Sequence, residues 1–123
     1  MKFNRFEEID VWKLSRAIVK EIYLITKDGE FSKDFSFKDQ IRRSSISIPC
    51  IIAEGYERKS NTEFIRYLYI SKGSAGELRT QLYLAFDLEY IDEKTFQILC
   101  LIVEEISKSL SGFIKYLDSK KLK

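Results

Sequence analysis

The amino-acid sequence predicts an all-α protein, an antiparallel up-and-down bundle of four helices that forms one domain over residues 1–123. Two heptad seams predict this fold, because apolar or small residues recur every three or four positions over 64–85 and again over 96–117. The chain has 123 residues, of which 45% are hydrophobic and 33% charged, as in a single globular domain. One proline and five glycines leave too few turns for a β-sandwich or barrel.

The first helix is expected over about 10–27, with Asp10 as its N-cap. Its apolar stripe consists of Val11, Leu14, Ile18, Ile22 and Ile25. Gly29 follows the helix, and glycine is the common residue just beyond a helix C-terminus. The next residues are expected to form a loop, with Phe31 and Phe35 as its apolar anchors.

The second helix is expected over about 37–55, with Ser36 as its cap. One face of this helix carries Ile41, Ser45, Ile48, Ile52 and Gly55. Two of these residues are small, which allows another helix backbone to come close. Pro49 lies inside the pattern, and we expect a bend there because proline removes a backbone donor and clashes with the preceding turn.

The third helix is expected over about 61–88 and begins with a capping box, in which Ser60 and Glu63 each satisfy a backbone amide of the other. Its seam consists of Phe64, Leu68, Ser71, Ala75, Leu78, Leu82 and Ala85. Gly73 and Gly76 lie mid-helix, where each costs about 1 kcal/mol relative to alanine. Such glycines predict close backbone contact with the second helix. The expected contact residues there are Ser44, Ser45 and Ala53.

The fourth helix is expected over about 92–118, with Asp92 as its cap. Its seam consists of Phe96, Leu99, Val103, Ile106, Leu110, Phe113 and Leu117. Only a short link separates it from the third helix. Two long heptad helices joined in this way form an antiparallel hairpin.

Two carboxylates are expected to be partly buried. Glu54 and Glu77 lie beside small and apolar residues, and an unpaired carboxylate is costly to bury. We therefore expect each of them to pair inside the bundle with an arginine, such as Arg42 or Arg43, or with backbone donors.

Four short patterns carry a family resemblance. They are Gln40-Ile41-Arg42-Arg43, Ser47-Ile48-Pro49, Ala53-Glu54-Gly55 and Gly73-Ser74-Ala75-Gly76-Glu77-Leu78. In this order they resemble the four-helix-bundle proteins encoded in intervening sequences of bacterial 23S rRNA genes, over residues 6–117. The accessory protein of diversity-generating retroelements is similar to that family. The resemblance implies a four-helix bundle that assembles into a homopentameric ring.

The residues that the family pattern marks as structural are Gln40, Arg42, Arg43, Pro49, Glu54, Gly55, Gly73, Gly76 and Glu77. The chain departs from the pattern after Pro49, where Cys50-Ile51 replaces the usual Ser-Asn. Cys50 and Cys100 are the only cysteines, and both are expected to be buried free thiols.

The composition argues against catalysis. The chain contains no histidine, which excludes a serine or cysteine triad of the usual kind and a histidine-containing metal site. It also contains no glycine-rich phosphate loop. We therefore expect a protein that is not an enzyme and that uses no cofactor, no metal and no catalytic residue.

The distribution of basic residues along the chain favours RNA binding. The net charge is only +2, but residues 38–79 carry eight basic and five acidic side chains, whereas 80–114 carry two basic and six acidic ones. The basic residues in question are Arg58, Lys59, Arg66, Lys72 and Arg79. Tyrosines lie among them, and this combination suits RNA through phosphate contacts and base stacking. A solvated face or a subunit interface explains the same residues.

The sequence therefore predicts a nucleic-acid-associated module that binds structured RNA or an RNA–protein complex as a homopentamer. The alternative is an oligomeric scaffold that binds only protein partners. The expected oligomer interface consists of Tyr56, Phe64, Tyr67 and Tyr69. The charged start of the chain lacks the apolar core of a signal peptide, and no apolar run is long enough to span a bilayer. These features predict a cytoplasmic bacterial protein with no membrane partner.

Overall fold

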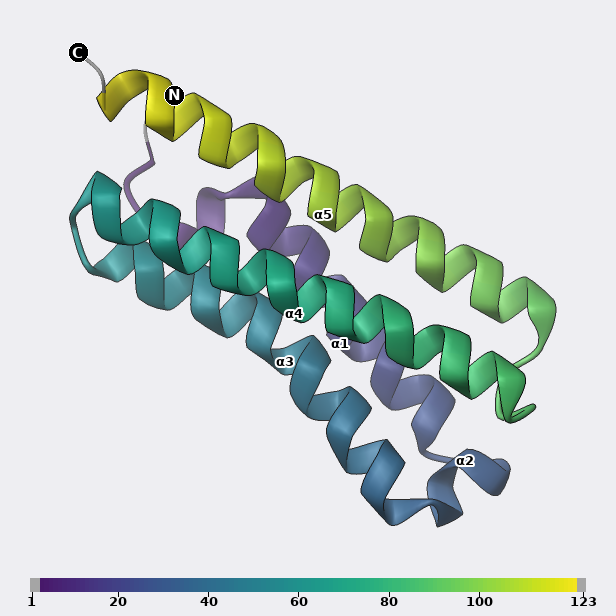
Figure 1. Ribbon diagram of the computed structural model, residues 1–123. Coiled ribbons are helices and arrows are strands. Elements are labelled where there is room, and N and C mark those ends of the chain that lie inside the picture. Colours follow the sequence, from purple (N-terminus) through teal and green to yellow (C-terminus); the bar gives the residue numbers. More distant parts are fainter. Residues whose placement is uncertain (1–2, 122–123) are drawn as a thin grey trace.

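Four long helices pack as an antiparallel bundle in the computed structural model, which describes residues 3–121 (Figure 1). The elements are the 3-10 helix η1 (Phe6–Glu8) and the α-helices α1 (Asp10–Thr26), α2 (Gly29–Lys33), α3 (Phe35–Glu57), α4 (Asn61–Asp87) and α5 (Glu93–Lys121). Within this described part no strand is present. Both α1 and α4 pack against α3 and α5, so the order around the bundle is α1, α3, α4, α5.

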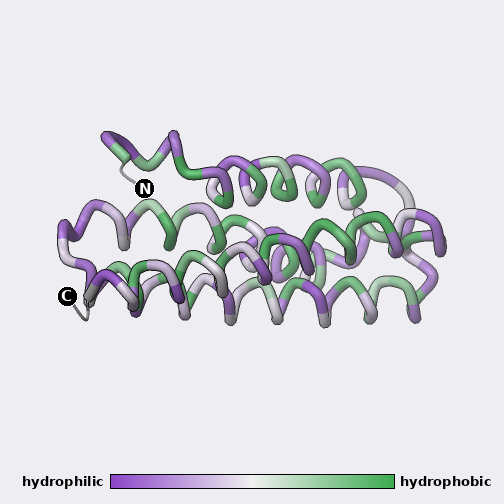
Figure 2. Tube along the Cα trace, turned by 90° about the horizontal axis from the view of Figure 1, so that it is seen from above, coloured by the Kyte–Doolittle hydropathy of each residue, from purple (hydrophilic) through white to green (hydrophobic). Residues whose placement is uncertain are grey.

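Both predicted heptad seams face the core. Every residue of the α4 seam is buried, from Phe64 at 6% exposure to Ala85 at 0%. On α5 the seam is buried at Leu99, Val103, Ile106, Leu110 and Leu117, whereas Phe96 and Phe113 pack against its edge. Figure 2 shows hydrophobic and hydrophilic positions alternating turn by turn along the long helices. The helical period in the sequence thus predicted correctly which sides of α4 and α5 meet.

The predicted helix caps are partly correct. Ser60 accepts a hydrogen bond from the Glu63 amide at 3.3 Å, and Asp92 accepts one from the Thr95 amide at 2.8 Å. The reciprocal half of the capping box does not form, because the Glu63 carboxylate pairs with Arg66 instead. The predictions for Asp10 and Ser36 are wrong. The N-cap of α1 is Ile9, which has no side-chain cap bond, so Asp10 lies inside the helix. Asp34 caps α3, because its carboxylate accepts the Phe37 amide at 3.1 Å.

The predicted loop after α1 contains the short helix α2. Gly29 opens it with φ +68°, a conformation that glycine adopts without strain. Phe31 is buried at 1% exposure and contacts the rings of Phe37 and Tyr90, with centroids 5.2 and 4.9 Å away. Phe35 is 74% exposed, so the prediction that it anchors the loop is wrong. Of the two phenylalanines, only Phe31 lies on the side of this segment that faces the bundle.

A tyrosine–carboxylate bond joins the α4–α5 link to the start of α3, and it makes a pH-dependent contribution to stability. The Tyr90 hydroxyl donates to Asp34 at 2.8 Å. This hydrogen bond, followed by desolvation, raises the pKa of Tyr90 above 10.0. Because the folded pKa exceeds the unfolded one, the contact stabilises the protein below about pH 10 and is lost as pH rises through the folded pKa.

We therefore expect wild type to be more stable than Tyr90→Phe at neutral pH, and the two to converge at strongly alkaline pH. Urea unfolding of both proteins across this pH range measures the difference. A difference that is constant at every pH would contradict the assignment.

Small residues allow α3 and α4 to approach closely, as the sequence predicted. A Cβ atom on Gly55 would lie only 2.5 Å from the Cβ of Tyr67. The buried Ser71 hydroxyl donates to the Ile48 carbonyl of α3 at 3.0 Å, which ties the two backbones together. In Figure 1 the two halves of α3 run in different directions, in agreement with the bend expected at Pro49. The helix nevertheless continues through that proline.

The predicted role of Gly73 and Gly76 in this contact is wrong for the protomer. Both glycines are exposed, and a Cβ atom on either would meet nothing within 4 Å. The reason is the helical period, because a seam that turns Ser71 and Ala75 inward turns Gly73 and Gly76 outward. Ala53 also faces away from α4 and lines a groove beside α1.

The two acids expected inside the bundle are on its surface. The Glu54 side chain is 57% exposed and lies 3.8 Å from Arg58, beyond hydrogen-bond distance. Glu77 is exposed and has no hydrogen bond or ion pair with any residue of 3–121. The expected partners bind elsewhere: Arg42 donates to Thr26 at 2.8 Å and Arg43 to Asp39 at 2.9 Å. Exposure to water removes the desolvation cost that required an internal partner.

Of the two cysteines, Cys100 is buried as expected and Cys50 is exposed, so the prediction is wrong for Cys50. Burial raises the pKa of the Cys100 thiol. Across the described residues, no helix has the length and apolar character that crossing a membrane requires.

Candidate nucleic-acid interface

The turn between α3 and α4 gathers three of the predicted RNA-binding cations. α3 ends at Glu57 and α4 begins at Asn61, so the connection is short. Lys59 lies in this connection with φ +59°, which is unusual for a residue other than glycine. The tight reversal brings Arg58 to the same tyrosine ring as Arg66, in the second turn of α4, and Lys59 follows Arg58 in the chain. We refer to Arg58, Lys59 and Arg66 as the turn cluster.

Tyrosine rings hold the cations of the turn cluster. The Arg58 guanidinium donates a hydrogen bond to the Tyr67 hydroxyl and lies 5.1 Å from the ring centroid. The Arg66 guanidinium lies 4.8 Å from the same ring, and the Lys59 ammonium lies 5.0 Å from the Tyr56 ring. Each contact is within the range of a cation–π interaction, which orients a cation without neutralising it.

Acidic residues balance much of the charge of the turn cluster. Arg66 forms an ion pair of 3.0 Å with Glu63, and Arg58 lies 3.8 Å from Glu54. The hydrogen bond from Arg66 lowers the pKa of Glu63 below its usual value. These pairs are exposed, and such pairs contribute little to stability in water. A phosphate group can therefore replace either carboxylate at small cost.

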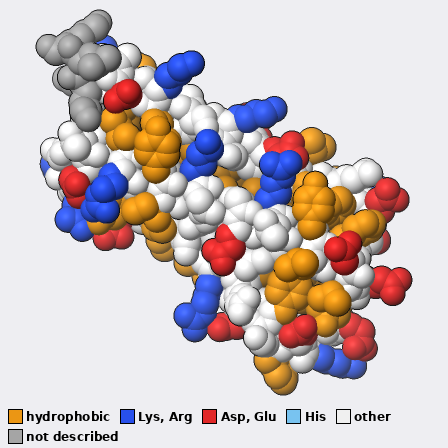
Figure 3. Space-filling model, viewed as in Figure 1, with side chains coloured by type: hydrophobic (Ala, Val, Ile, Leu, Met, Phe, Trp, Pro, Cys, Tyr) orange, Lys and Arg blue, Asp and Glu red, His pale blue; other side chains and the backbone are white. Residues whose placement is uncertain are grey.

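The other two predicted cations lie further along α4. Arg79 is 13 residues beyond Arg66, a distance of roughly 20 Å at 1.5 Å per residue. It forms an ion pair of 3.2 Å with Glu104 on α5. Lys72 makes no ion pair or hydrogen bond with the described residues. Figure 3 shows that Lys and Arg side chains on this side of the molecule are scattered among apolar ones, without forming one patch.

The predicted oligomer interface is largely used inside the protomer. Phe64 and Tyr67 are buried, with 6% and 8% exposure. Phe64 packs edge-to-face against Tyr56 and Phe113, and the Tyr56 hydroxyl donates to the Phe3 carbonyl at 2.7 Å. Only Tyr69, at 59% exposure, offers most of its surface to a partner. The prediction is therefore corrected for Phe64 and Tyr67, because packing against α3 and α5 covers them.

Further cation–aromatic contacts lie on the side formed by α1 and α3, and sequence reasoning missed them. The Arg42 guanidinium lies 4.1 Å from the Tyr23 ring centroid, and the Arg16 guanidinium lies 5.7 Å from that of Trp12. Trp12 and Arg16 are four residues apart on one helix, a spacing that predicts contact. No local signal reveals the contact between Tyr23 and Arg42, because it joins two helices.

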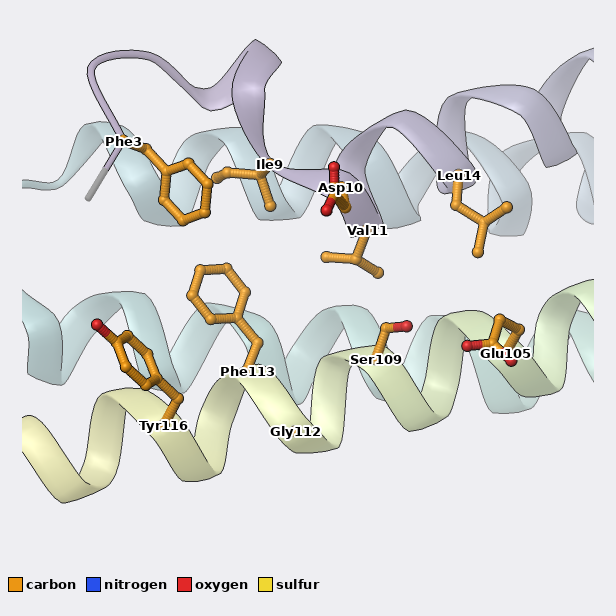
Figure 4. Close-up of a pocket in the computed structure, with 10 residues that line it drawn as sticks. All are labelled: Phe3, Ile9, Asp10, Val11, Leu14, Glu105, Ser109, Gly112, Phe113 and Tyr116. Atoms are coloured by element: carbon orange, nitrogen blue, oxygen red, sulfur yellow. The ribbon is translucent and has the colours of Figure 1, made fainter. Parts of the chain in front are cut away.

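A hollow of about 480 Å³ lies between the start of α1 and the second half of α5 (Figure 4). The rings of Phe3 and Phe113 meet there, with centroids 5.9 Å apart. The charged residues that line it, Asp10 and Glu105, are both acidic. This charge disfavours a phosphate, so the hollow is not part of the candidate RNA surface. Among residues 3–121 no group of three or more His, Cys, Asp or Glu side chains is placed to hold a metal ion.

The fold and this site define a small antiparallel four-helix-bundle protein with cations held over tyrosine rings at one end. The chain belongs to the 23S rRNA-intervening sequence protein family, whose family model matches residues 7–112. This match confirms the resemblance that the sequence patterns carry.

A solved structure supports the same assignment. It is the crystal structure of a protein of unknown function from the S23 ribosomal protein family of Bacteroides thetaiotaomicron VPI-5482. That protein is 30% identical in sequence, with a TM-score of 0.79, and the alignment covers 85% of this chain and 95% of that chain. A comparison with curated proteins finds no significant match.

Proposed function

We propose that the protein is a non-enzymatic cytoplasmic module that binds structured RNA, alone or in an RNA–protein complex, as a homo-oligomer with five copies in a ring. The observation that carries the proposal is the turn cluster, in which Arg58, Lys59 and Arg66 are held over tyrosine rings. The protein's family is named for an rRNA intervening sequence, which supports RNA as the ligand. RNA offers phosphates for the cations and bases for stacking.

Assembly supplies the affinity that one protomer lacks. Glu54 and Glu63 reduce the field of the turn cluster, so a single copy presents few free positive charges. A ring repeats the cluster in each subunit. Several copies sum their potentials and engage several phosphates of one RNA, which raises the effective affinity without any new contact.

The salt dependence of RNA binding tests this proposal. The variant to measure carries Arg58→Gln, Lys59→Gln and Arg66→Gln, and the probe is a structured rRNA fragment in a gel-shift titration. We expect at least a tenfold loss of affinity at low salt. Affinity falls as salt rises, and the slope of log affinity against log salt reports how many phosphates the protein neutralises. In the variant this slope should be shallower by about 0.7 for each contact to a single-stranded phosphate that is lost.

The matched control removes three exposed cations elsewhere, through Lys13→Gln, Lys33→Gln and Arg43→Gln. Each of these residues lies within 4.0 Å of an acid, as Arg58 and Arg66 do in the turn cluster, so the control loses at least as many surface ion pairs as the turn-cluster variant. Equal weakening in the control and the turn-cluster variant would show that the turn cluster is not the RNA surface. A native oligomer that binds no RNA at low salt would favour the alternative function.

The alternative is a scaffold that binds only protein. The observation in its favour is a group of exposed apolar side chains near the α4–α5 link. These are Tyr83, Leu84, Leu88, Ile98 and Leu101, which are 47–66% exposed. Apolar surface gathered in this way is typical of a protein-binding face. Figure 3 shows apolar side chains clustered on that part of the molecule.

A further inference from the structure

α4 carries a second heptad seam on the side that faces away from the core. Ile70, Gly73, Glu77, Thr80 and Leu84 are spaced by three and four residues, and all five are exposed. Ile70 and Leu84 keep 44% and 47% of their surface in water. The outer side of a bundle helix is normally polar. We call these five residues the outer face of α4.

Two properties allow the outer face of α4 to pack against a pair of helices from another molecule. A Cβ atom on Gly73 would meet nothing within 4 Å, so the backbone there is open to close approach. Glu77 is the only charged residue of the five, and it has no partner among the described residues. The face is thus a ridge with an aliphatic side chain at each end, Ile70 and Leu84, a shallow centre at Gly73 and one unpaired negative charge.

A groove of complementary character lies between α1 and α3. It has a volume of about 360 Å³, and its lining includes Trp12, Arg16, Val19, Ile46, Pro49 and Cys50. Arg16 is the only charged residue of the lining, and it makes no ion pair with the residues of 3–121. We call this the α1–α3 groove.

We propose that the outer face of α4 of one protomer packs into the α1–α3 groove of a second copy, with Glu77 beside the second copy's Arg16. The groove is largely apolar, the ridge offers Ile70 and Leu84 to it, and each surface contributes one unpaired charge of opposite sign. The inference rests on the proposed homo-oligomer and names the surfaces that build it.

This contact has a consequence for symmetry. The ridge and the groove are different surfaces on different helices, so every copy uses both at once. A contact of this heterologous kind generates a closed ring or an open filament, whereas a twofold dimer joins identical surfaces. It therefore fits the proposed ring.

Cross-linking between native and introduced cysteines tests the contact. Cys50 lines the groove and is exposed, so it is available as the native partner. In a Cys100→Ala background, Thr80→Cys places a second thiol on the outer face of α4. A short bismaleimide should then join the chains into a ladder that extends beyond the dimer on a denaturing gel.

Two controls make the ladder specific. Gln97→Cys, an exposed position on α5, should give no ladder when it replaces Thr80→Cys. Adding Cys50→Ser to Thr80→Cys should abolish the ladder. A dimer that forms through position 80 without Cys50 would overturn the proposal, because it would show that two α4 helices contact each other.

Charge reversal tests the pairing of Arg16 with Glu77. Arg16→Glu and Glu77→Arg should each weaken assembly at least tenfold by light scattering, and the double variant should restore it to within a few-fold of wild type. Lys20→Glu, an exposed change on α1 outside the groove lining, should leave assembly intact. Circular dichroism checks that all variants stay helical.

The two levels of the proposal fail separately. If wild type is oligomeric but the Thr80→Cys variant gives no ladder and the double charge reversal gives no rescue, the named surfaces are wrong and the proposed oligomer stands. If wild type is monomeric at micromolar concentration by light scattering, both the contact and the proposed ring are overturned.

Discussion

Replacing Phe31 with alanine is expected to lower the free energy of unfolding by about 3–5 kcal/mol. The side chain is 1% exposed, and it stacks with Tyr90 and packs against Phe37. Its removal leaves a cavity where α2, α3 and the α4–α5 link meet, and the rings around it are left without a packing partner. The loss is large beside the total of about 5–15 kcal/mol that is typical of one domain.

The matched control for this prediction lies four residues away. Phe35 is 74% exposed, so Phe35→Ala removes the same atoms from a site that is already in water. We expect a change within about 0.5 kcal/mol. Urea denaturation followed by circular dichroism measures both variants. Similar losses for the two phenylalanines would show that Phe31 does not anchor this end of the bundle.

Gly55→Ala is expected to destabilise the protein although alanine favours helices. The new Cβ would lie 2.5 Å from the Cβ of Tyr67, which the α4 backbone holds in place. α3 and α4 must therefore move apart at this contact, at a typical cost of about 1–3 kcal/mol. The gain in helix propensity, at most about 1 kcal/mol, offsets only part of this cost.

Gly112→Ala is the control, because Gly112 also lies inside a long helix but a Cβ there meets nothing within 4 Å. This variant should gain up to about 1 kcal/mol from helix propensity alone. Thermal melts at equal protein concentration compare the two. If Gly55→Ala proved as stable as Gly112→Ala, the close approach of α3 and α4 at this position would be refuted.

The proposed RNA surface and the proposed assembly surface use different residues, so variants can separate the two functions. The turn cluster lies where α3 passes into α4, whereas the proposed contact between copies involves the middle of α4 and the α1–α3 groove. A protein altered only in the turn cluster should therefore still assemble. A protein altered only at Glu77 should lose RNA affinity through loss of avidity.

The sequence by itself determined the four long helices, both core seams and the family. The heptad spacing of apolar residues predicts which side of a helix is buried. Ser60 and Asp92 mark helix starts, because each accepts a hydrogen bond from the backbone amide three residues later. These features depend on residues close together in the chain. For that reason they can be read before the helices are placed in space.

Only the tertiary structure decided which glycine meets another helix and where the charged groups point. α4 carries two seams, and its glycines belong to the exposed side, so their role depended on how the helix was turned toward α3. Glu54 and Glu77 lie on outward sides, where water solvates them and no buried partner is needed. Contacts between different helices, such as that of Arg42 with Tyr23, depend on distances that helical periodicity does not contain.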